Sequence, residues 1–550
     1  MTQFLIENMA PLMFAALVIV LLLGYPVAFS LAAVGIGFGA LGIHLGLLEP
    51  SLAQALPQRI WGIMSNDTLL AIPFFTFMGL ILERSGMAED LLDTIGQLFG
   101  PIRGGLAYAV IFVGALLGAT TGVVAASVIS MGLISLPIML RYGYDRRFAC
   151  GVIAASGTLA QIIPPSLVLI VMADQLGRSV GDMYAGAFLP AALLVVLYIA
   201  FAIGVAVFKP AWAPAMPGDA VMLRESPERS GLRSLLVLVV LSTLASIGLM
   251  RVQFPGDMPT DEKVVILVLL VTVISFVAAA VCRVLRPGLL SRLAERAIFV
   301  LVPPLVLIFL VLGTIFLGVA TPTEGGAMGA VGALVMATFR KRLSWDLVKQ
   351  AMDVTGKLST FVLFILVGAR VFSLTFYAVE GHLWVESLLL GLPGAQTGFL
   401  VVVNVLIFLL AFFLDFFELA FIVIPLLAPA AETLGIDLVW FGVLIAVNLQ
   451  ASFLHPPFGF SLFFLRSVAP DRDYVDKVSG KPTAKVTLGQ IYWGAIPFIM
   501  IQILMVAILV VFPEIVMVYK SGESTVDPAS IQIEVPTLQR IGPMGGLGEN

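Results

Sequence analysis

The sequence predicts an all-α polytopic membrane protein, built as an inverted repeat with two helical hairpins and two broken helices. Three observations lead to this fold class: the composition, a repeated pair of prolines and the charges of equivalent loops. The chain has 550 residues, of which 60% are hydrophobic and 12% charged, and its mean hydropathy is +1.07. A helix that spans a bilayer needs about 20 apolar residues, and such stretches recur along most of the chain. The two-residue alternation of a membrane barrel is absent from the sequence.

The chain opens on an apolar segment that we expect to stay in the lipid bilayer. Its first residues, MTQFLIENMAPLMF, contain neither a basic region nor a small-residue cleavage site, so a removed signal peptide is not expected. The two cysteines, Cys150 and Cys282, exclude a disulfide framework and give no metal-ligand spacing. The three scattered histidines (His44, His382 and His455) favour structural or interfacial roles, and nothing suggests nucleic-acid binding.

Two proline pairs reveal an internal repeat. Pro164 and Pro165 in GTLAQIIPPS lie 292 residues before Pro456 and Pro457 in FLHPPFGF. The same spacing links three further residues with their counterparts: Pro137 with Pro429, Gly143 with Gly435, and Asp145 with Asp437. Further along, a spacing of 308 aligns VGDMYAGAFLP (180–190) with LGQIYWGAIP (488–497). We therefore expect a first copy in 1–208, a central loop with additional membrane helices in 209–296, a second copy in 297–513 and a polar tail in 514–550.

Each copy is expected to contain a hairpin followed by a broken helix: 105–140 and 148–172 in the first, 398–432 and 438–465 in the second. Proline lacks the N–H that a helix needs, so each pair breaks its helix. Unpaired backbone is tolerated at membrane depth only inside protein or along a watery cavity. Broken helices offer carbonyl oxygens to a cation and helix N-termini to an anion, as in secondary transporters. The alternative is a kink that serves only packing.

The loop charges indicate that the two copies are inverted. Three arginines lie in RYGYDRR, whereas its counterpart AETLGIDLVW has no basic residue. The next pair reverses, with one arginine in DQLGRSVGD and five basic residues in RSVAPDRDYVDKVSGKPTAK. Because cytoplasmic loops are enriched in Lys and Arg, equivalent loops are expected on opposite sides of the membrane. A direct repeat with chance loop composition is the alternative.

The first hairpin has its predicted tip near 118–122, where small and hydroxyl residues gather. The tip is expected to face the first helix break and to share a site with it. The candidate residues are Gly118, Thr120, Thr121 and Gly122 from the tip, and Ser156, Gly157 and Thr158 from the break. The alternative is that small residues there only let helices pack closely.

The second tip, FFLDFFE, holds Asp415 and Glu418 inside an apolar segment, and ionisable residues in membranes are functional candidates. We favour Asp415 as a site residue and expect the second break to begin at Asn448; the alternative is that both acids cap helices. Arg370 is a cation either for a substrate carboxylate or for a structural acid. Glu324 is expected to cap a helix that starts near Pro322.

Together these residues carry a resemblance to a known family. The motifs are GYPVAFSLAAVG (24–35), LLAIPFFTFMGLILERSGMAEDL (69–91), GTLAQIIPPS, GVATPTEGGAMGA and HPPFGFSLF. Over nearly its whole length the chain resembles the large membrane subunit of TRAP (tripartite ATP-independent periplasmic) transporters. The resemblance implies an elevator-type secondary transporter of the bacterial inner membrane, in which Na⁺ drives uptake of an organic acid. It implies two protein partners, a periplasmic substrate-binding protein and a small four-helix membrane subunit, and no cofactor besides the coupling Na⁺.

The resemblance also implies site residues. One Na⁺ site lies between the tip and break of the first copy (Gly118, Thr120, Thr121, Ser156, Gly157), and a second involves Phe413, Asp415 and Asn448. Substrate contacts are expected at Thr121, Ser166, Arg370 and Asn448. Ser127 stands where many relatives carry an acid. The long 209–296 region resembles the subfamily whose presumed substrates include 2-oxo acids and lactate, which makes C4-dicarboxylates less favoured.

Three other functions compete with this one: a self-sufficient Na⁺/carboxylate symporter, a channel and an intramembrane enzyme. Against an enzyme, the sequence has no His–Glu–x–x–His pattern and no Ser–His or Asp–Asp dyad at a plausible spacing.

Overall fold

The computed structural model describes residues 2–217, 231–253, 260–285 and 290–518, except Phe413, Phe458 and Lys477. Within these ranges the chain is helical almost throughout, which confirms the all-α class. Two short strands, β1 (Tyr474–Val475) and β2 (Pro482–Thr483), pair antiparallel within one loop. Eight described helices are long and apolar enough to cross a membrane, or up to eleven if each bent helix pair counts as one span. The prediction of a polytopic membrane protein is therefore confirmed.

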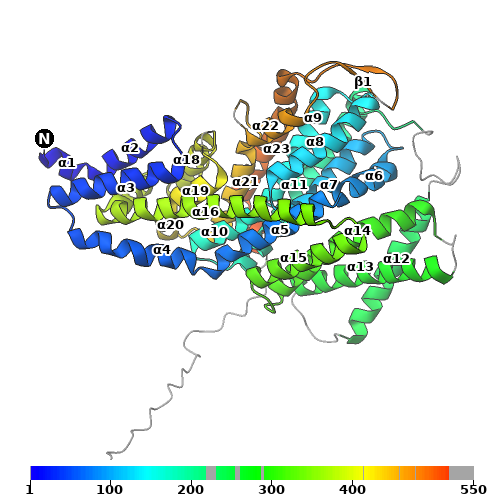
Figure 1. Cartoon of the computed structure of the whole chain (residues 1–550), viewed down its shortest axis with the longest axis horizontal. Helices are drawn as coiled ribbons and strands as arrows, with labels where there is room; N and C mark the ends of the chain where they lie inside the picture. Colours follow the sequence, from blue (N-terminus) through cyan, green and yellow to red (C-terminus); the bar gives the residue numbers. More distant parts are fainter. Residues whose placement is uncertain are drawn as a thin grey trace, which may run out of the picture.

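The helices form an elongated body with the N-terminus at one end (Figure 1). The N-terminal part contains α1 (Thr2–Glu7), α2 (Met9–Leu22), α3 (Val27–His44), η1 (Pro50–Ala55), α4 (Leu56–Met64), η2 (Asp67–Leu70), α5 (Ala71–Arg84) and α6 (Met87–Phe99). Helix α3 packs along the long α16 (Trp345–Ala378). Glycines on both helices allow backbone contact: Gly35 lies against Val371 and Phe372, and Gly368 lies against Ala28.

The first hairpin and broken helix follow. The elements are α7 (Gly105–Thr121), α8 (Val124–Arg141), α9 (Arg146–Thr158), η3 (Leu159–Gln161), α10 (Leu167–Leu176), α11 (Val180–Phe208) and η4 (Pro210–Trp212). Gly104 and Gly122 flank α7 with φ of 77° and 58°, a left-handed conformation that glycine adopts at little cost. The turn at Gly122 separates α7 from α8, so the tip lies at residues 122–123.

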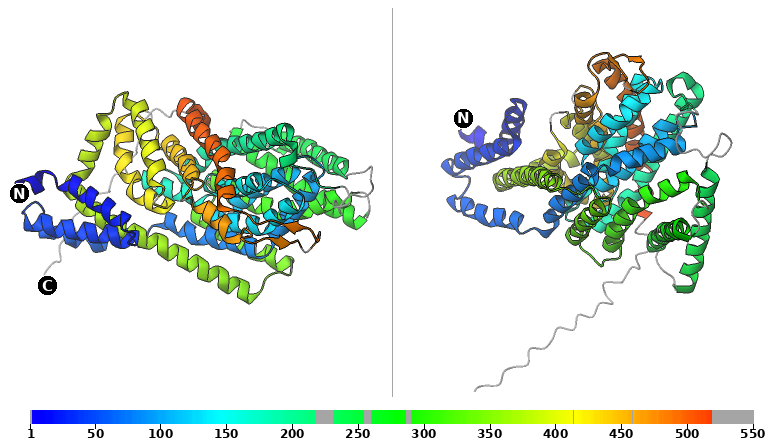
Figure 2. Two further views of the ribbon diagram at one scale, coloured as in Figure 1. Left: turned by 90° about the horizontal axis from the view of Figure 1, so that it is seen from above. Right: turned by 45° about the vertical axis from the view of Figure 1, so that its right-hand side comes forward.

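The central region adds two apolar helices, α12 (Leu232–Gln253) and α13 (Thr260–Leu285). They pack on each other and on α14 (Arg292–Phe316) through Leu238, Ala279, Ile298 and Val302. Figure 2 shows this pair at the end of the body opposite to the N-terminus. Most of their remaining surface is exposed and apolar, as expected for helices that face lipid.

The C-terminal part contains α15 (Pro322–Phe339), α17 (Gly381–Leu390), α18 (Ala395–Leu410), α19 (Phe416–Ile422), α20 (Ile424–Thr433), α21 (Leu438–Ser452), α22 (Phe460–Val468), α23 (Leu488–Val511) and α24 (Glu514–Met517). Helix α15 starts at Pro322, and Thr321 and Glu324 form a reciprocal cap, which confirms the expected role of Glu324. Within the region predicted as a polar tail, residues 514–517 form α24, and Val516 is buried where α24 packs on α11. Residues 519–550 lie outside the described ranges.

Residues at the repeat spacing take the same local roles. Asp145 and Asp437 cap α9 and α21, each carboxylate accepting from two backbone N–H groups at 2.9–3.2 Å. Ser179 and Thr487, which are 308 residues apart, cap α11 and α23. The sequence matches therefore mark equivalent helix starts.

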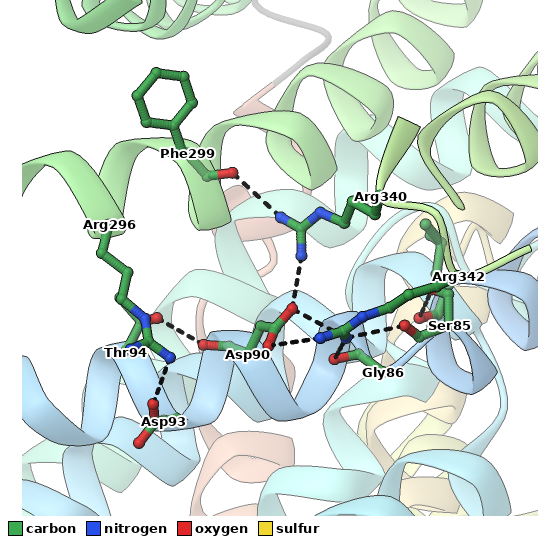
Figure 3. A network of polar contacts seen from close by, with 10 residues as sticks. Ser85, Gly86, Asp90, Asp93, Thr94, Arg296, Phe299, Arg340 and Arg342 are labelled. Atoms are coloured by element: carbon green, nitrogen blue, oxygen red, sulfur yellow. Dashed lines mark hydrogen bonds and ion pairs between the residues drawn. The ribbon is translucent and has the colours of Figure 1, made fainter. Parts of the chain in front are cut away.

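An ionic cluster ties α6 to α14 and to the end of α15 (Figure 3). Asp90 accepts from Arg340 at 2.9 Å and from Arg342 at 3.1 Å. One turn further along α6, Asp93 pairs with Arg296 at 2.7 Å. These contacts hold α6 against α14 and the end of α15. Helix α6 leads into the first hairpin, and α14 and α15 precede the second hairpin.

Candidate functional site

The first helix break lies between α9 and α10, and all its residues except the partly exposed Ile163 are buried. The chain leaves helical geometry after Gln161, passes Pro164 and Pro165, and resumes at Leu167. Ser166 shapes the second half: its hydroxyl accepts from the Val168 N–H at 3.2 Å, as a helix cap does, and donates to the Gln161 carbonyl. Ser166 therefore supports the backbone of the break.

The tip of the first hairpin lies directly against this break. A Cβ atom at Gly118 would come within 2.9 Å of the Ala160 nitrogen, and one at Gly122 would face Leu167 and the Pro165 carbonyl. Gly157 makes a similar close contact with Val128 on the other arm of the hairpin. Bare backbone at the tip thus meets bare backbone at the break, and the structure brings the predicted residues of the first copy together.

The hydroxyl groups of this region are buried and mostly engaged. The Thr120 and Thr121 hydroxyls each donate to the Leu117 carbonyl at 2.9 Å, and the Ser127 hydroxyl lies 2.9 Å from that of Thr121. Thr158 donates to the Ala155 carbonyl at 2.8 Å. These threonine oxygens keep lone pairs, because each hydroxyl uses its proton in a helical bond.

Among the described residues, several buried oxygen atoms at or near the first break have no hydrogen-bond partner. They include the Ser156 hydroxyl and the side-chain carbonyls of Gln161 and Gln450. A buried polar atom without a partner is costly and calls for an explanation such as a bound ion. The sequence reasoning missed Gln161, although its place inside GTLAQIIPPS was a local signal.

The second break spans residues 453–459 and contains Pro456 and Pro457. The expectation that it begins at Asn448 is wrong, because α21 continues through Asn448 to Ser452. The Asn448 side-chain amide does not compete for the backbone hydrogen bonds of its own helix. It donates to the backbone carbonyl and the side-chain oxygen of Asn404, at 2.8 and 3.0 Å. The break is instead closed by Ser461, whose N–H and hydroxyl both donate to the Phe453 carbonyl.

At the second tip, Asp415 and Glu418 form a reciprocal helix cap. The Asp415 carboxylate accepts from the Glu418 N–H at 2.8 Å, and the Glu418 carboxylate accepts from the Asp415 N–H at 2.8 Å. The alternative interpretation, in which both acids cap helices, therefore accounts for these hydrogen bonds. No hydrogen bond joins Asp415 to Asn448 in the part of the chain that the structure describes, and Phe413 lies outside it.

Arg370 on α16 lines two neighbouring cavities together with Arg59 on the short helix α4. One cavity of about 260 Å³ also contacts Gln175 and Tyr377, and the other, of about 250 Å³, also contacts Asn66. Neither guanidinium pairs with an acid among the described residues. Two cations without partners that face one space are suited to an anion. Arg59 was missed because nothing in its local sequence distinguishes it.

Two ion pairs join loops of the first copy to loops of the second copy. Arg141, at the end of α8, pairs with Asp476 of the loop after α22 at 2.9 Å. Arg178, after α10, pairs with Glu432, at the end of α20, at 3.1 Å. Each bond joins a loop of one copy to the non-equivalent loop of the other.

Glycine contacts between the copies are exchanged in the same way. Gly494 of the second copy lies against the Arg147 carbonyl of the first. Their counterparts, Gly186 and Val439, also touch each other. The contact and its counterpart at the two sequence spacings are therefore both present in the structure.

Comparison with known proteins identifies the family. The family described as "Tripartite ATP-independent periplasmic transporter, DctM component" matches residues 14–515. The C4-dicarboxylate TRAP transporter large permease protein DctM of Pseudomonas aeruginosa is 27% identical over 478 residues, covering 87% of this chain and 91% of that protein. The ectoine TRAP transporter large permease protein TeaC of Halomonas elongata is 25% identical and covers 92% and 98%. The isethionate TRAP transporter permease protein DctMQ of Oleidesulfovibrio alaskensis is 23% identical and covers 84% and 60%. Since the family match spans most of the sequence, this chain belongs to the DctM component family of tripartite ATP-independent periplasmic transporters.

Proposed function

We propose that this chain carries an organic acid anion across the bacterial inner membrane, driven by Na⁺, by an elevator-type movement. As a member of the family it is a transporter permease and not an enzyme. The observation that carries the proposal is the first break, where buried oxygens without partners lie beside a hairpin tip made of bare backbone.

Na⁺ binds at the first break in this proposal. A hard cation takes oxygen ligands, and the Ser156 hydroxyl, the Gln161 side-chain carbonyl and the Thr121 hydroxyl supply them. Among the described residues no group of three or more His, Cys, Asp or Glu side chains could hold a metal ion. Neutral oxygen atoms are therefore the available ligands, and they suit a weakly bound monovalent ion. At the second break Asp415 contributes its carboxylate without leaving its role as a cap.

The substrate carboxylate is bound through Arg370 with the help of Arg59. Relatives are named for C4-dicarboxylates, ectoine and isethionate, which are organic solutes that each carry an acidic group. Two guanidiniums at one cavity would bind such a group through charge-assisted hydrogen bonds. We propose that the substrate is a monocarboxylate such as a 2-oxo acid or lactate. The reason is that the long 209–296 region resembles the subfamily whose presumed substrates include these acids.

The loop contacts support the inverted repeat on which an elevator movement depends. In an inverted pair, the loop after the first hairpin and the loop after the second broken helix share one side. Arg141 and Asp476 join these two loops, and Arg178 and Glu432 join the other two. The first pair of loops holds most of the basic residues, so we assign it to the cytoplasm.

The partners proposed are those of a tripartite system: a small four-helix membrane subunit and a periplasmic binding protein. The name DctMQ of one relative supports a close association of large and small permease parts.

The test is uptake of labelled 2-oxo acids and lactate into proteoliposomes that hold both membrane subunits, with and without a Na⁺ gradient and the binding protein. We expect uptake to require both. Uptake with Na⁺ alone would favour the self-sufficient symporter, and uptake that ignores Na⁺ would contradict the ion sites.

Single substitutions then test the sites. Ser156→Ala, Thr121→Val and Asp415→Asn should each shift the Na⁺ activation curve to higher concentration, whereas Ser246→Ala, a buried hydroxyl on the remote α12, should not. Asp415→Asn keeps a good helix cap and removes only the charge. Unchanged curves in all three variants would refute the site assignment.

A further inference from the structure

We propose a binding site for an anionic phospholipid of the cytoplasmic leaflet, in a groove where α9, α11 and α23 meet. The groove has a volume of about 470 Å³. Its lining is mostly apolar and includes two cations, Arg147 at the start of α9 and Lys209 after α11. No acid is among the residues that line it. The site rests on the membrane orientation of the proposed function, but not on Na⁺ or the substrate.

Two tryptophans and two cations are among the residues that line the groove. Lys209 places its ammonium group 4.0 Å from the centre of the Trp212 ring, and Trp493, which also lines the groove, has 65% of its surface exposed. Neither the Arg147 side chain nor Lys209 pairs with an acid among the described residues. Tryptophan gathers at the membrane interface, and Arg and Lys there attract lipid phosphates.

The groove lies on the basic side of the protein. Arg147 belongs to the segment RYGYDRR, whose first residue, Arg141, is bonded to Asp476 of the other basic loop. That side faces the cytoplasm by the positive-inside rule. The cytoplasmic leaflet carries the anionic lipids, and basic pockets between helices on that side bind their head groups. Charge thus matches the lipid and the apolar walls match its acyl chain.

The equivalent junction of the other copy shows what belongs in the groove. There the chain fills the space itself: Val516 of α24 packs on Gly186 and has 1% of its surface exposed. Phe208, which lies 308 residues before Val516, is 85% exposed beside the open groove. The counterparts of Arg147 and Lys209 are Val439 and Met517, both apolar. The open junction is therefore the one that carries the cations.

Two variants separate the head-group and acyl-chain parts of the site. Arg147→Gln with Lys209→Gln removes both cations, and Arg472→Gln with Lys485→Gln removes two exposed cations from the loop on the same side as a matched control. Gly204→Leu fills the groove without a change of charge, because a Cβ at Gly204 meets no atom within 4 Å. The readouts are native mass spectrometry of the complex with its small subunit, and thermal stability of the delipidated complex titrated with phosphatidylglycerol or phosphatidylcholine.

We expect one tightly retained phosphatidylglycerol fewer in both groove variants than in the control pair. Half-saturation of the stabilisation by phosphatidylglycerol should weaken about thirtyfold in the double glutamine variant. The same lipid count and titration in all variants would overturn the proposal. Equal stabilisation by inorganic phosphate would show a free-anion site instead. Loss of the small subunit from the groove variants alone would show that this subunit, and not lipid, covers the groove.

Because these readouts need no transport, a failure here leaves the proposed function standing. A failure of Na⁺-dependent uptake likewise leaves the lipid count unchanged.

Discussion

Gln450 donates a hydrogen bond from its side-chain nitrogen to the Thr158 hydroxyl at 3.2 Å, and these two residues occupy equivalent positions in the two copies, 292 residues apart. Both are completely buried. In the inverted repeat that we propose, a residue that touches its own counterpart lies next to the axis that relates the copies. The contact lies two residues from Ser156 on α9 and two residues from Asn448 on α21.

This contact should contribute modestly to stability. Thr158→Val and Gln450→Leu each remove one partner, and a double-mutant cycle should give a coupling of about 0.6 kcal/mol, the usual size inside membranes. Thermal or denaturant unfolding of the purified protein in mild detergent provides the measurement. Strict additivity of the two substitutions would contradict a bond between the copies.

Close packing behind the first tip gives a second prediction. A Cβ atom at Gly79 on α5 would come within 2.5 Å of the Thr121 Cα, and backbone cannot turn away as a side chain can. Gly79→Ala should therefore destabilise the protein by about 1–3 kcal/mol and weaken Na⁺ activation by displacing the tip. The control is Gly37→Ala on α3, where a Cβ meets no atom within 4 Å. A Gly79→Ala variant that equals this control in both assays would refute the tight contact.

Arg59 and Arg370 should act together on the substrate. A hydrogen bond to a charged group contributes about 1.5–3 kcal/mol, so Arg59→Gln and Arg370→Gln should each raise the KM of uptake about tenfold or more. Arg103→Gln, an exposed cation away from the cavity, is the control. An unchanged KM for Arg59→Gln would restrict the anion contact to Arg370.

The loop bond to Asp476 gives a pH dependence. Hydrogen bonds from Arg141 and Ser479 hold the pKa of the Asp476 carboxyl well below its usual range. Its stabilising contribution is therefore complete above the unfolded pKa of about 3.9 and is lost as the pH falls further. We expect the melting temperature to fall more steeply from pH 5 to pH 3 in the native protein than in Asp476→Asn. Parallel curves would contradict the lowered pKa.

Features encoded by neighbouring residues were predictable from the sequence. The proline pairs locate both breaks because each removes helical N–H groups where it stands. The cap at Thr321 and Glu324 is likewise a short-range pattern. The prediction at Asn448 is wrong. A side-chain amide in an apolar segment suggests a helix break unless its distant hydrogen-bond partner, here Asn404, is known. The approach of Arg59 to Arg370 across 311 positions depends on tertiary packing and leaves no trace in either segment.

In the elevator movement that we propose, the two ion pairs between loops favour some changes of conformation over others. The ion pair of Arg141 with Asp476 joins the copies on one side of the membrane. The ion pair of Arg178 with Glu432 joins them on the other side. Separating the copies on either side would break one of these ion pairs. A cycle that keeps both ion pairs would therefore move the two broken helices as one unit, without parting the loops that join them.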